Sequence, residues 1–140
     1  MDVIDTTPYV PVQRAYFRKI ECQNILSERE KKLAKCTAKL DKARNASTQA
    51  SAALEAAGQT LERGSDDPRE YRELQKAFES AQRKLARASE KVITLEVAHH
   101  TDRQAVIQAR TALAEAIEQF STELTQFLEN INQAQVNTNP

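Results

Sequence analysis

Glycine, proline and aromatic residues are scarce in this sequence of 140 residues. It contains two glycines, four prolines and no tryptophan, and aromatic residues make up 5% of the chain. So few breaking residues disfavour a fold with many turns, and so few rings cannot fill a thick core. Charged residues reach 29%, and Ala, Leu, Glu, Gln, Lys and Arg, which favour helices, dominate the rest. The composition predicts an all-α protein whose core is a seam between long helices.

Cysteines are also few, and long apolar runs are missing. Cys22 and Cys36 lie on one predicted helix, about 21 Å apart at ~1.5 Å per residue, so they cannot bridge each other. We expect both to be small buried residues in a reducing compartment. No run approaches the ~18 apolar residues of a membrane span, and the first ten residues do not resemble a signal peptide. We therefore expect a cytoplasmic protein, with peripheral association at a membrane as an alternative.

The clearest interruption of the helical pattern is Gly-Ser-Asp-Asp at residues 64–67. Gly64 suits the left-handed conformation that ends a helix, and Asp67 and Glu70 stand where a capping box requires them. These residues predict a tight turn between two helices. The first helix is expected to begin near Pro11, because proline is tolerated only in a first turn. The predicted elements are an extended segment at 1–10, a helix at 11–63, a turn at 64–67, a helix at 68–132 and a flexible tail at 133–140.

Apolar residues recur every seven positions on both sides of this turn. The first ladder is Leu26, Leu33, Leu40, Leu54 and Leu61, with Ser47 as its one break. Smaller residues, such as those at 36, 43 and 50, follow three positions later. The second ladder is Tyr71, Phe78, Leu85, Val92, His99, Val106, Leu113, Phe120 and Phe127. Spacings of three and four residues are typical of a coiled-coil seam. The pattern predicts a long two-helix antiparallel coiled-coil hairpin in which the numbers of facing residues add up to about 132.

Charged and histidine residues interrupt these ladders at a few positions. The predicted register places Arg29 beside Asp102, which indicates a cross-helix ion pair that sets the alignment of the helices with little net stabilisation. The same register places Leu33 beside His99. His100 lies off the seam, and adjacent helical residues do not face one ligand, so we expect a structural role for the two histidines rather than a metal site.

Acidic and basic residues are equal in number, 20 of each, but they are distributed unevenly. Residues 11–46 carry ten basic and four acidic side chains, whereas residues 92–140 carry two basic and six acidic ones. Attraction between neighbouring helices accounts for much of this bias. A basic row also indicates a surface for an anionic membrane or an acidic protein, with a solvated helix face as the alternative. Its members are Lys32, Lys35, Lys39 and Lys42. Nucleic acid is an unlikely partner, because no aromatic residues interleave with the row.

Apolar residues outside the seam gather in the part of the hairpin that holds the chain termini. Two helices bury one stripe each, so this extra surface would stay exposed in a monomer. We expect another chain, such as a second copy or a helical partner, to dock here and complete a larger helical bundle. The alternative is that the N-terminal segment covers it. The predicted interface residues are Phe17, Ile20, Ile25, Ile93, Val97, Ile107, Ile117, Phe120, Leu124, Phe127, Leu128 and Ile131.

Two stretches of the sequence resemble BAR domains. The stretch DPREYREL at residues 67–74 is followed by alanines at 77, 81 and 88, which is similar to the way the last BAR helix opens. The stretch FSTELTQF at residues 120–127 is also similar to that family. The resemblance covers roughly residues 12–131 and implies a helical hairpin that dimerises near its termini and binds curved anionic membranes. BAR monomers have three core helices, whereas this sequence predicts two.

Catalytic and cofactor motifs are not found in the sequence. It has no glycine-rich phosphate loop, no serine elbow and no cysteines at zinc spacing, and a two-helix hairpin offers no enclosed pocket. We therefore expect a non-enzymatic protein without a cofactor. The favoured function is a structural or adaptor coiled coil that mediates self-association or protein assembly. A BAR-like peripheral membrane protein and a secretion chaperone or export-stalk cofactor are the alternatives.

Overall fold

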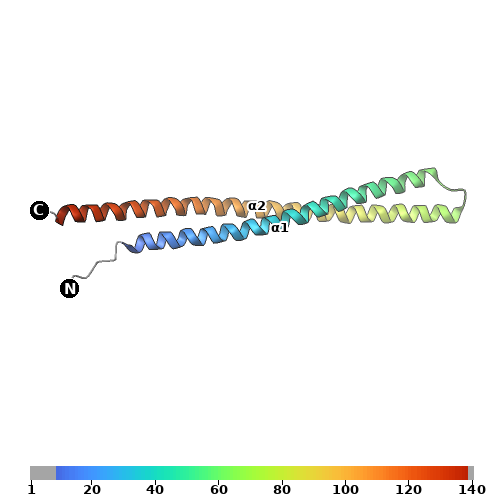
Figure 1. Cartoon of the computed structure of the whole chain (residues 1–140). Helices are drawn as coiled ribbons and strands as arrows, with labels where there is room; N and C mark the ends of the chain where they lie inside the picture. Colours follow the sequence, from blue (N-terminus) through green and yellow to red (C-terminus); the bar gives the residue numbers. More distant parts are fainter. Residues whose placement is uncertain (1–8, 139–140) are drawn as a thin grey trace. The chain divides into compact units, whose positions relative to one another are not determined.

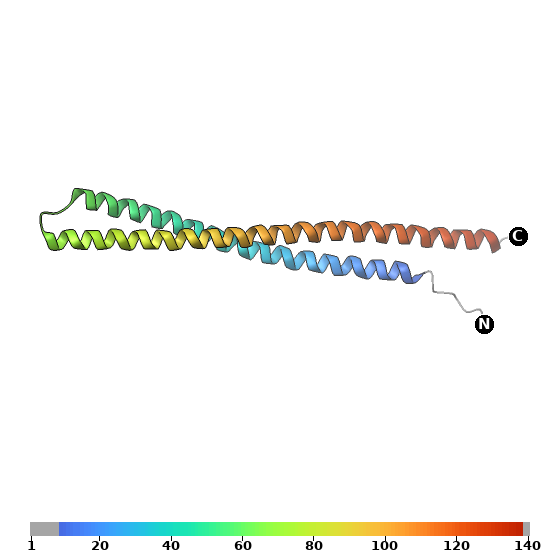
Figure 2. The same cartoon turned by 180° about the vertical axis from the view of Figure 1, so that it is seen from behind.

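The computed structural model describes residues 9–138, with side chains for residues 9–136. It consists of helix α1 (Tyr9–Arg63) and helix α2 (Pro68–Thr138), and no strand occurs among the described residues. The two helices run in opposite directions and pack against each other (Figures 1 and 2). The predicted all-α helical hairpin is therefore confirmed.

The outer ends of both helices differ from the predicted ones. Helix α1 begins at Tyr9, two residues before Pro11. Proline is still accommodated, because the first turn of a helix has no intrahelical acceptor for its N–H groups. Helix α2 continues to Thr138 instead of ending at Asn132, since no glycine or proline occurs in residues 133–138. The rest of the predicted extended segment and flexible tail, residues 1–8 and 139–140, lies outside the described residues.

The connection between the helices occupies residues 64–67, where the turn was predicted. Gly64 has a φ of 65°, which L side chains rarely adopt and glycine adopts without strain. Its N–H donates hydrogen bonds to the carbonyl oxygens of Leu61 at 3.0 Å and Thr60 at 3.3 Å. These bonds satisfy carbonyl groups that the end of α1 would otherwise leave free.

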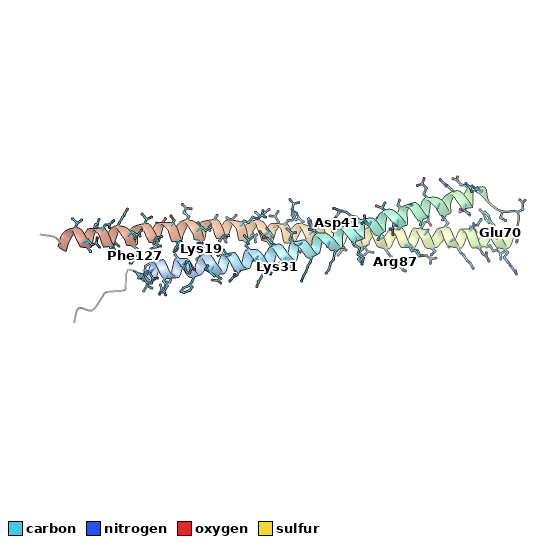
Figure 3. The ribbon with its side chains drawn as sticks, in the orientation of Figure 1. Lys19, Lys31, Asp41, Glu70, Arg87 and Phe127 are labelled. Atoms are coloured by element: carbon cyan, nitrogen blue, oxygen red, sulfur yellow. The ribbon has the colours of Figure 1, made fainter. Side chains whose placement is uncertain are left out.

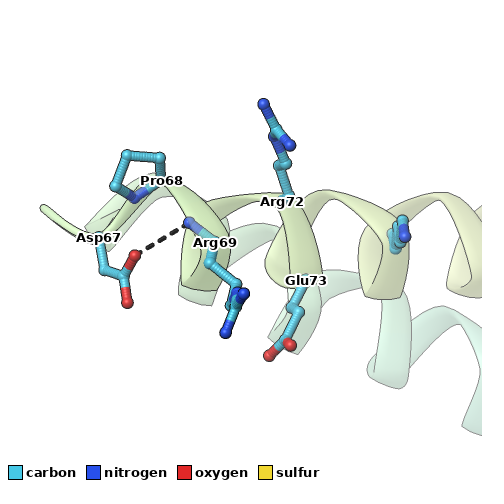
Figure 4. A pocket seen from close by; sticks show the side chains of 6 residues that line it. Asp67, Pro68, Arg69, Arg72 and Glu73 are labelled. Atoms are coloured by element: carbon cyan, nitrogen blue, oxygen red, sulfur yellow. Dashed lines mark hydrogen bonds between the residues drawn. The ribbon is translucent and has the colours of Figure 1, made fainter.

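The first turn of α2 is capped by a hydrogen-bond relay rather than by the predicted capping box. The carboxylate of Asp67 accepts a bond from the N–H of Arg69 at 3.0 Å (Figure 4). The N–H of Asp67 donates to the hydroxyl of Ser65 at 3.2 Å, and that hydroxyl donates to Glu70 at 2.8 Å. Ser65 thus lies between the two residues that were expected to bond directly.

The hairpin divides into two compact units, and each contains a piece of both helices. Unit 1 comprises Met1–Lys32 with Arg103–Pro140, and unit 2 comprises Leu33–Asp102. The core of unit 1 is a line of buried residues from both helices, which are Val12, Ala15, Cys22, Val106, Ala109 and Ala116. The line on α1 extends the predicted seven-residue spacing toward the N-terminus, so the seam reaches one helical turn from the start of the helix.

In unit 2 the buried apolar residues are confined to a short stretch of α1, residues 36–43, in the middle of that helix. They are Cys36, Leu40 and Ala43, and no side chain between residues 44 and 101 is fully buried in the described structure. The predicted ladder residues of this unit are nevertheless sheltered or half-buried, with the exception of Tyr71, which is 40% exposed. Alanines and single leucines on two helices exclude little water. The two ladders therefore still face each other here, but their side chains are only half-buried.

The register of the helices differs from the predicted one by about one helical turn. In unit 1 the ring of Tyr16 contacts Phe120, and in unit 2 the hydroxyl of Thr37 bonds to His99. The numbers of both pairs add up to 136 instead of 132, so His99 meets Thr37 and not Leu33. The reason lies at the tip of unit 2, where the connection runs outward and the first turn of α2 lies beyond the end of α1 (Figure 1). The predicted register assumed that the helices end at the same level.

Candidate interaction surface

An aromatic cluster joins the two helices of unit 1. The rings of Tyr9 and Phe127 meet edge to face with their centroids 5.7 Å apart, and Tyr16 contacts Phe120 at the same distance. Tyr16 also lies 5.9 Å from Phe17, its neighbour on α1. Such pairs contribute roughly 0.5–1.5 kcal/mol beyond the burial of their surface. The cluster therefore fixes the alignment of α1 and α2 near the chain termini.

A lysine occupies a seam position within this cluster. Lys19 follows Val12 by seven residues, and its ammonium group lies 5.2 Å from the centroid of the Phe120 ring. Figure 3 shows Lys19 and Phe127 on the sides of their helices that face the opposite helix. The cation–π contact explains how a charged residue is accommodated in the seam without an ionic partner.

An apolar groove of about 380 Å³ opens beside the aromatic cluster. It is lined on α1 by Tyr9, Val12, Gln13, Tyr16 and Phe17, and on α2 by Phe120 and Leu124. Its residues on α1 recur at spacings of three and four, as on one face of a helix. The groove is thus a second apolar stripe beside the seam, and nothing in the described part of unit 1 covers it.

Several large apolar side chains around this groove are exposed. Phe17 is 60% exposed, Leu128 is 51% exposed and Ile117 is 45% exposed. On α2, Leu124, Leu128 and Ile131 follow one another at spacings of four and three residues, and Ile117 precedes Leu124 by seven. We define the terminal apolar face of unit 1 by its half-exposed members, which are Tyr9, Tyr16, Phe17, Ile117, Leu128 and Ile131.

The structure separates the predicted interface residues into four groups. Ile20, Phe120, Leu124 and Phe127 are half-buried, and the two phenylalanines take part in packing within the chain. Phe17, Ile117, Leu128 and Ile131 belong to the terminal apolar face, while Ile25 and Ile107 are exposed elsewhere in unit 1. Ile93 and Val97 are 62% and 64% exposed, but they lie in unit 2. The sequence analysis missed Tyr9 and Tyr16, which recur seven residues apart.

The predicted register-setting residues belong to different units. Arg29, in unit 1, donates a hydrogen bond from its guanidinium group to the carbonyl oxygen of Ala105 at 3.1 Å. Asp102, in unit 2, is 9% exposed and is the buried charged residue of the described chain. The bond to Ala105 links α1 to α2 within unit 1, and the ion pair between Arg29 and Asp102 stays a prediction.

His99 is half-buried in the seam of unit 2 and bonds to Thr37. The hydroxyl of Thr37 lies 2.9 Å from the carbonyl oxygen of Leu33 and 3.0 Å from Nε2 of His99, within hydrogen-bond distance of both. This bond gives the polar edge of His99 a hydrogen-bond partner inside the seam.

Basic side chains border a second groove, which lies in unit 2. Lys39 and Lys42 of α1 and Lys91 of α2 line it together with alanines and Leu95. The lysines on α1 were predicted from the sequence, whereas Lys91, which lines the groove from α2, was not. Lys35 is exposed in the same unit, whereas Lys32 lies in unit 1.

A third hollow lies at the tip of unit 2, and its lining residues are Asp67, Pro68, Arg69, Arg72, Glu73 and Lys76. Figure 4 shows Arg72 and Glu73 pointing to opposite sides of the helix, so the side chains do not converge on a common point. Within residues 9–138, no group of three or more His, Cys, Asp or Glu is placed to hold a metal ion.

Comparison of the chain with known protein families, with curated proteins and with solved structures gave no match. The resemblance to BAR domains consequently stays a prediction from the sequence. Neither helix, over its described residues, contains a stretch that is long and apolar enough to cross a membrane.

Proposed function

We propose that the chain is a non-enzymatic assembly protein that self-associates through the terminal apolar face. The observation that carries this proposal is the exposure of large apolar residues beside a groove, with Phe17 60% exposed and Leu128 51% exposed. A patch of this kind on a two-helix unit is typical of a surface that packs against further helices. A second hairpin would bury both stripes and form a four-helix bundle.

Charges that flank the face favour a second copy as the partner. Arg14 and Arg18 lie on α1, and Glu115 and Glu118 lie on α2, and none of the four forms an ion pair within the described chain. A dimer with twofold symmetry presents the same patch on both subunits. When α1 of each copy lies against α2 of the other, the arginines of α1 attract the glutamates of α2. The twofold symmetry makes this attraction occur twice in the dimer.

The test is the mass of the protein in solution at several concentrations, measured by light scattering and sedimentation. The natural sequence should approach twice the mass of one chain as concentration rises. The variant Ile117→Lys/Leu128→Lys should remain monomeric, because two buried unpaired charges would each weaken the interface strongly. Far-UV circular dichroism should show that its helix content is unchanged.

The matched control is Gln119→Lys/Asn130→Lys. Both positions are exposed on α2, two residues beyond the tested ones and on another side of the helix. This variant should dimerise like the natural sequence. The proposal is wrong if the natural sequence has the mass of one chain at every concentration, or if the control dissociates as readily as the tested variant.

Peripheral binding to an anionic membrane is a second candidate, and the exposed lysines of unit 2 are the observation that favours it. Each lysine near such a surface contributes about 1 kcal/mol. Helices that bind a membrane surface usually carry bulky apolar residues beside their basic ones. The residues between these lysines are instead alanines and one leucine, which gives this candidate less support than self-association. Cys22 and Cys36 are both buried thiols, which suits a reducing compartment for either function.

A further inference from the structure

The groove in unit 2 has an apolar floor and a basic rim. Its volume is about 440 Å³, and its floor is made by Ala43, Ala46, Ala88 and Leu95 from both helices. Lys39 and Lys42 stand on one side of it, and Lys91 stands on the other. The surface therefore combines small apolar side chains, which permit close approach, with positive charge on both margins.

The basic margins continue along both helices. Lys35 precedes Lys39 by four residues on α1, and Lys84 precedes Lys91 by seven residues on α2, so each shares a helix face with the rim. Residues 33–46 carry four basic and one acidic side chain, and residues 83–91 carry the same numbers. Two helices that both carry excess positive charge repel each other here, so attraction between them does not explain the pattern.

The lysines of the rim lack counter-charges in the described chain. Lys39, Lys42 and Lys91 form no ion pair with any residue that the structure describes, whereas Glu96 is bonded to Arg44 at 3.5 Å. Arg87, which adds to the basic side of α2, points away from α1 (Figure 3). A ligand that brings negative charge along this line would remove the repulsion between the two rows.

We infer that this groove binds an acidic amphipathic helix of a partner protein. A helix lying along the groove would place a stripe of small apolar residues on Ala43, Ala46 and Ala88. Carboxylates at spacings of three and four residues on its flanks would then reach the two basic rows. Small residues on the floor allow helix axes to approach to about 8–10 Å.

The shape of the groove favours a helix over a flat membrane or a nucleic acid. A bilayer would meet the lysine tips but would leave the apolar floor uncovered, because no bulky apolar side chain stands on the rim to enter the lipid. A nucleic acid would need aromatic or arginine side chains for its bases, and the rim residues are lysines. An acidic helix uses both the floor and the margins.

The binding experiment uses the full chain and a synthetic helical peptide with an alanine and leucine stripe flanked by glutamates at spacings of three and four. A peptide of the same composition in scrambled order, phosphatidylserine vesicles and a single-stranded oligonucleotide are measured in parallel. We expect the patterned peptide to bind, with an affinity that falls as salt rises. The variant Lys39→Glu/Lys42→Glu/Lys91→Glu should bind it at least about tenfold more weakly.

The control variant Arg69→Glu/Arg72→Glu/Lys76→Glu has the same change in net charge outside the groove. All three residues line the hollow at the tip of unit 2 and not the groove. It should bind the peptide within about twofold of the natural sequence. If the charge reversals disturb folding, the neutral variant Lys39→Gln/Lys42→Gln/Lys91→Gln replaces them. It should lose less affinity for the patterned peptide than the glutamate variant and more than the control.

Four outcomes would overturn the inference. They are equal losses in the groove and control variants, equal binding of the scrambled peptide, binding of vesicles or oligonucleotide without binding of the patterned peptide, and no binding of any probe. Each would show that the arrangement of the lysines around this groove does not determine what the protein recognises.

Discussion

Unit 1 and unit 2 share the same two helices but differ in how their seams are filled. Unit 1 has six buried apolar residues and two aromatic pairs that cross between the helices. Unit 2 has three buried apolar residues at one end, and its remaining seam is half-buried. The surfaces beside the seams differ as well, because unit 1 presents an apolar groove and unit 2 presents one bordered by lysines.

The comparison shows that seam and surface vary together in this hairpin. Large side chains in unit 1 fill the seam and also extend past it, which creates a face for further helices. Small side chains in unit 2 leave a half-buried seam with an open groove beside it. The borders of this groove are lysines, whereas the groove of unit 1 is bordered by large apolar residues. Stability should therefore depend on few positions in unit 2, and these positions should lie at one end of it.

The largest effect is expected from Leu40→Ala, since Leu40 is 2% exposed and is the largest side chain in the buried part of unit 2. The substitution should lower the free energy of unfolding by about 2–5 kcal/mol. Leu54→Ala, at a half-buried ladder position of the same unit, should cost roughly half as much or less. Urea denaturation of both variants measures the difference. Equal losses would mean that the thin part of the seam is as well packed as the buried end.

The seam itself could be predicted from the sequence because burial on a helix repeats with a fixed period. Nearly every ladder residue is buried or half-buried, and the small residues Cys36 and Ala43 that follow Leu33 and Leu40 by three positions are buried. The same period, continued toward the N-terminus, reaches Val12 and Ala15, which the analysis of the ladders stopped short of. The turn was found because Gly64 and Asp67 have local conformational preferences.

The register of the two helices could not be predicted. The path of the four-residue connection has no periodic signature, and a displacement of one turn leaves both ladders facing each other. That displacement decides that Thr37, and not Leu33, meets His99. The extension of α2 to Thr138 was missed for another reason, because polar helix formers were taken as a fraying tail.

The next largest effect is expected at the turn of unit 2. Gly64→Ala places a Cβ on a residue with a φ of 65°, which should destabilise the hairpin by about 1–2 kcal/mol. Gly64→Asn should cost less, because asparagine tolerates this conformation better. Thermal unfolding followed by circular dichroism measures both. If the Gly64→Ala variant were as stable as the natural sequence, the connection between the helices would have to adopt another conformation in solution.

A smaller effect is expected for the aromatic cluster of unit 1. A double-mutant cycle with Tyr16→Leu and Phe120→Leu should give a coupling of roughly 0.5–1.5 kcal/mol, because each ring loses the other as a partner. The same cycle with Tyr71→Leu and Phe120→Leu joins residues from different units and should give additive changes. Coupling near zero for Tyr16 and Phe120 would remove the aromatic alignment that distinguishes unit 1.

The smallest effect, and the only gain in stability, is expected at Gly58 in the thin part of unit 2. Gly58 lies within α1, where glycine is less favourable than alanine by about 0.5–1 kcal/mol. A Cβ at this position would lie 3.4 Å from Cε2 of Phe78, which is the short end of ordinary van der Waals contact. Because the seam here is only half-buried, the ring of Phe78 has room to move by the few tenths of an ångström that the methyl group requires.

Gly58→Ala should therefore raise the midpoint of urea unfolding. Gly58→Val should not, because valine is a weaker helix former than alanine and its branched side chain would press further into Phe78. Gly58→Ala combined with Phe78→Leu separates the two contributions, since the smaller side chain leaves the gain in helix propensity intact. A loss of stability in Gly58→Ala that Phe78→Leu relieves would show that the ring cannot move. The half-buried seam of unit 2 would then be tightly packed around Gly58. The two units would in that case differ in their surface grooves but not in how well their seams are packed.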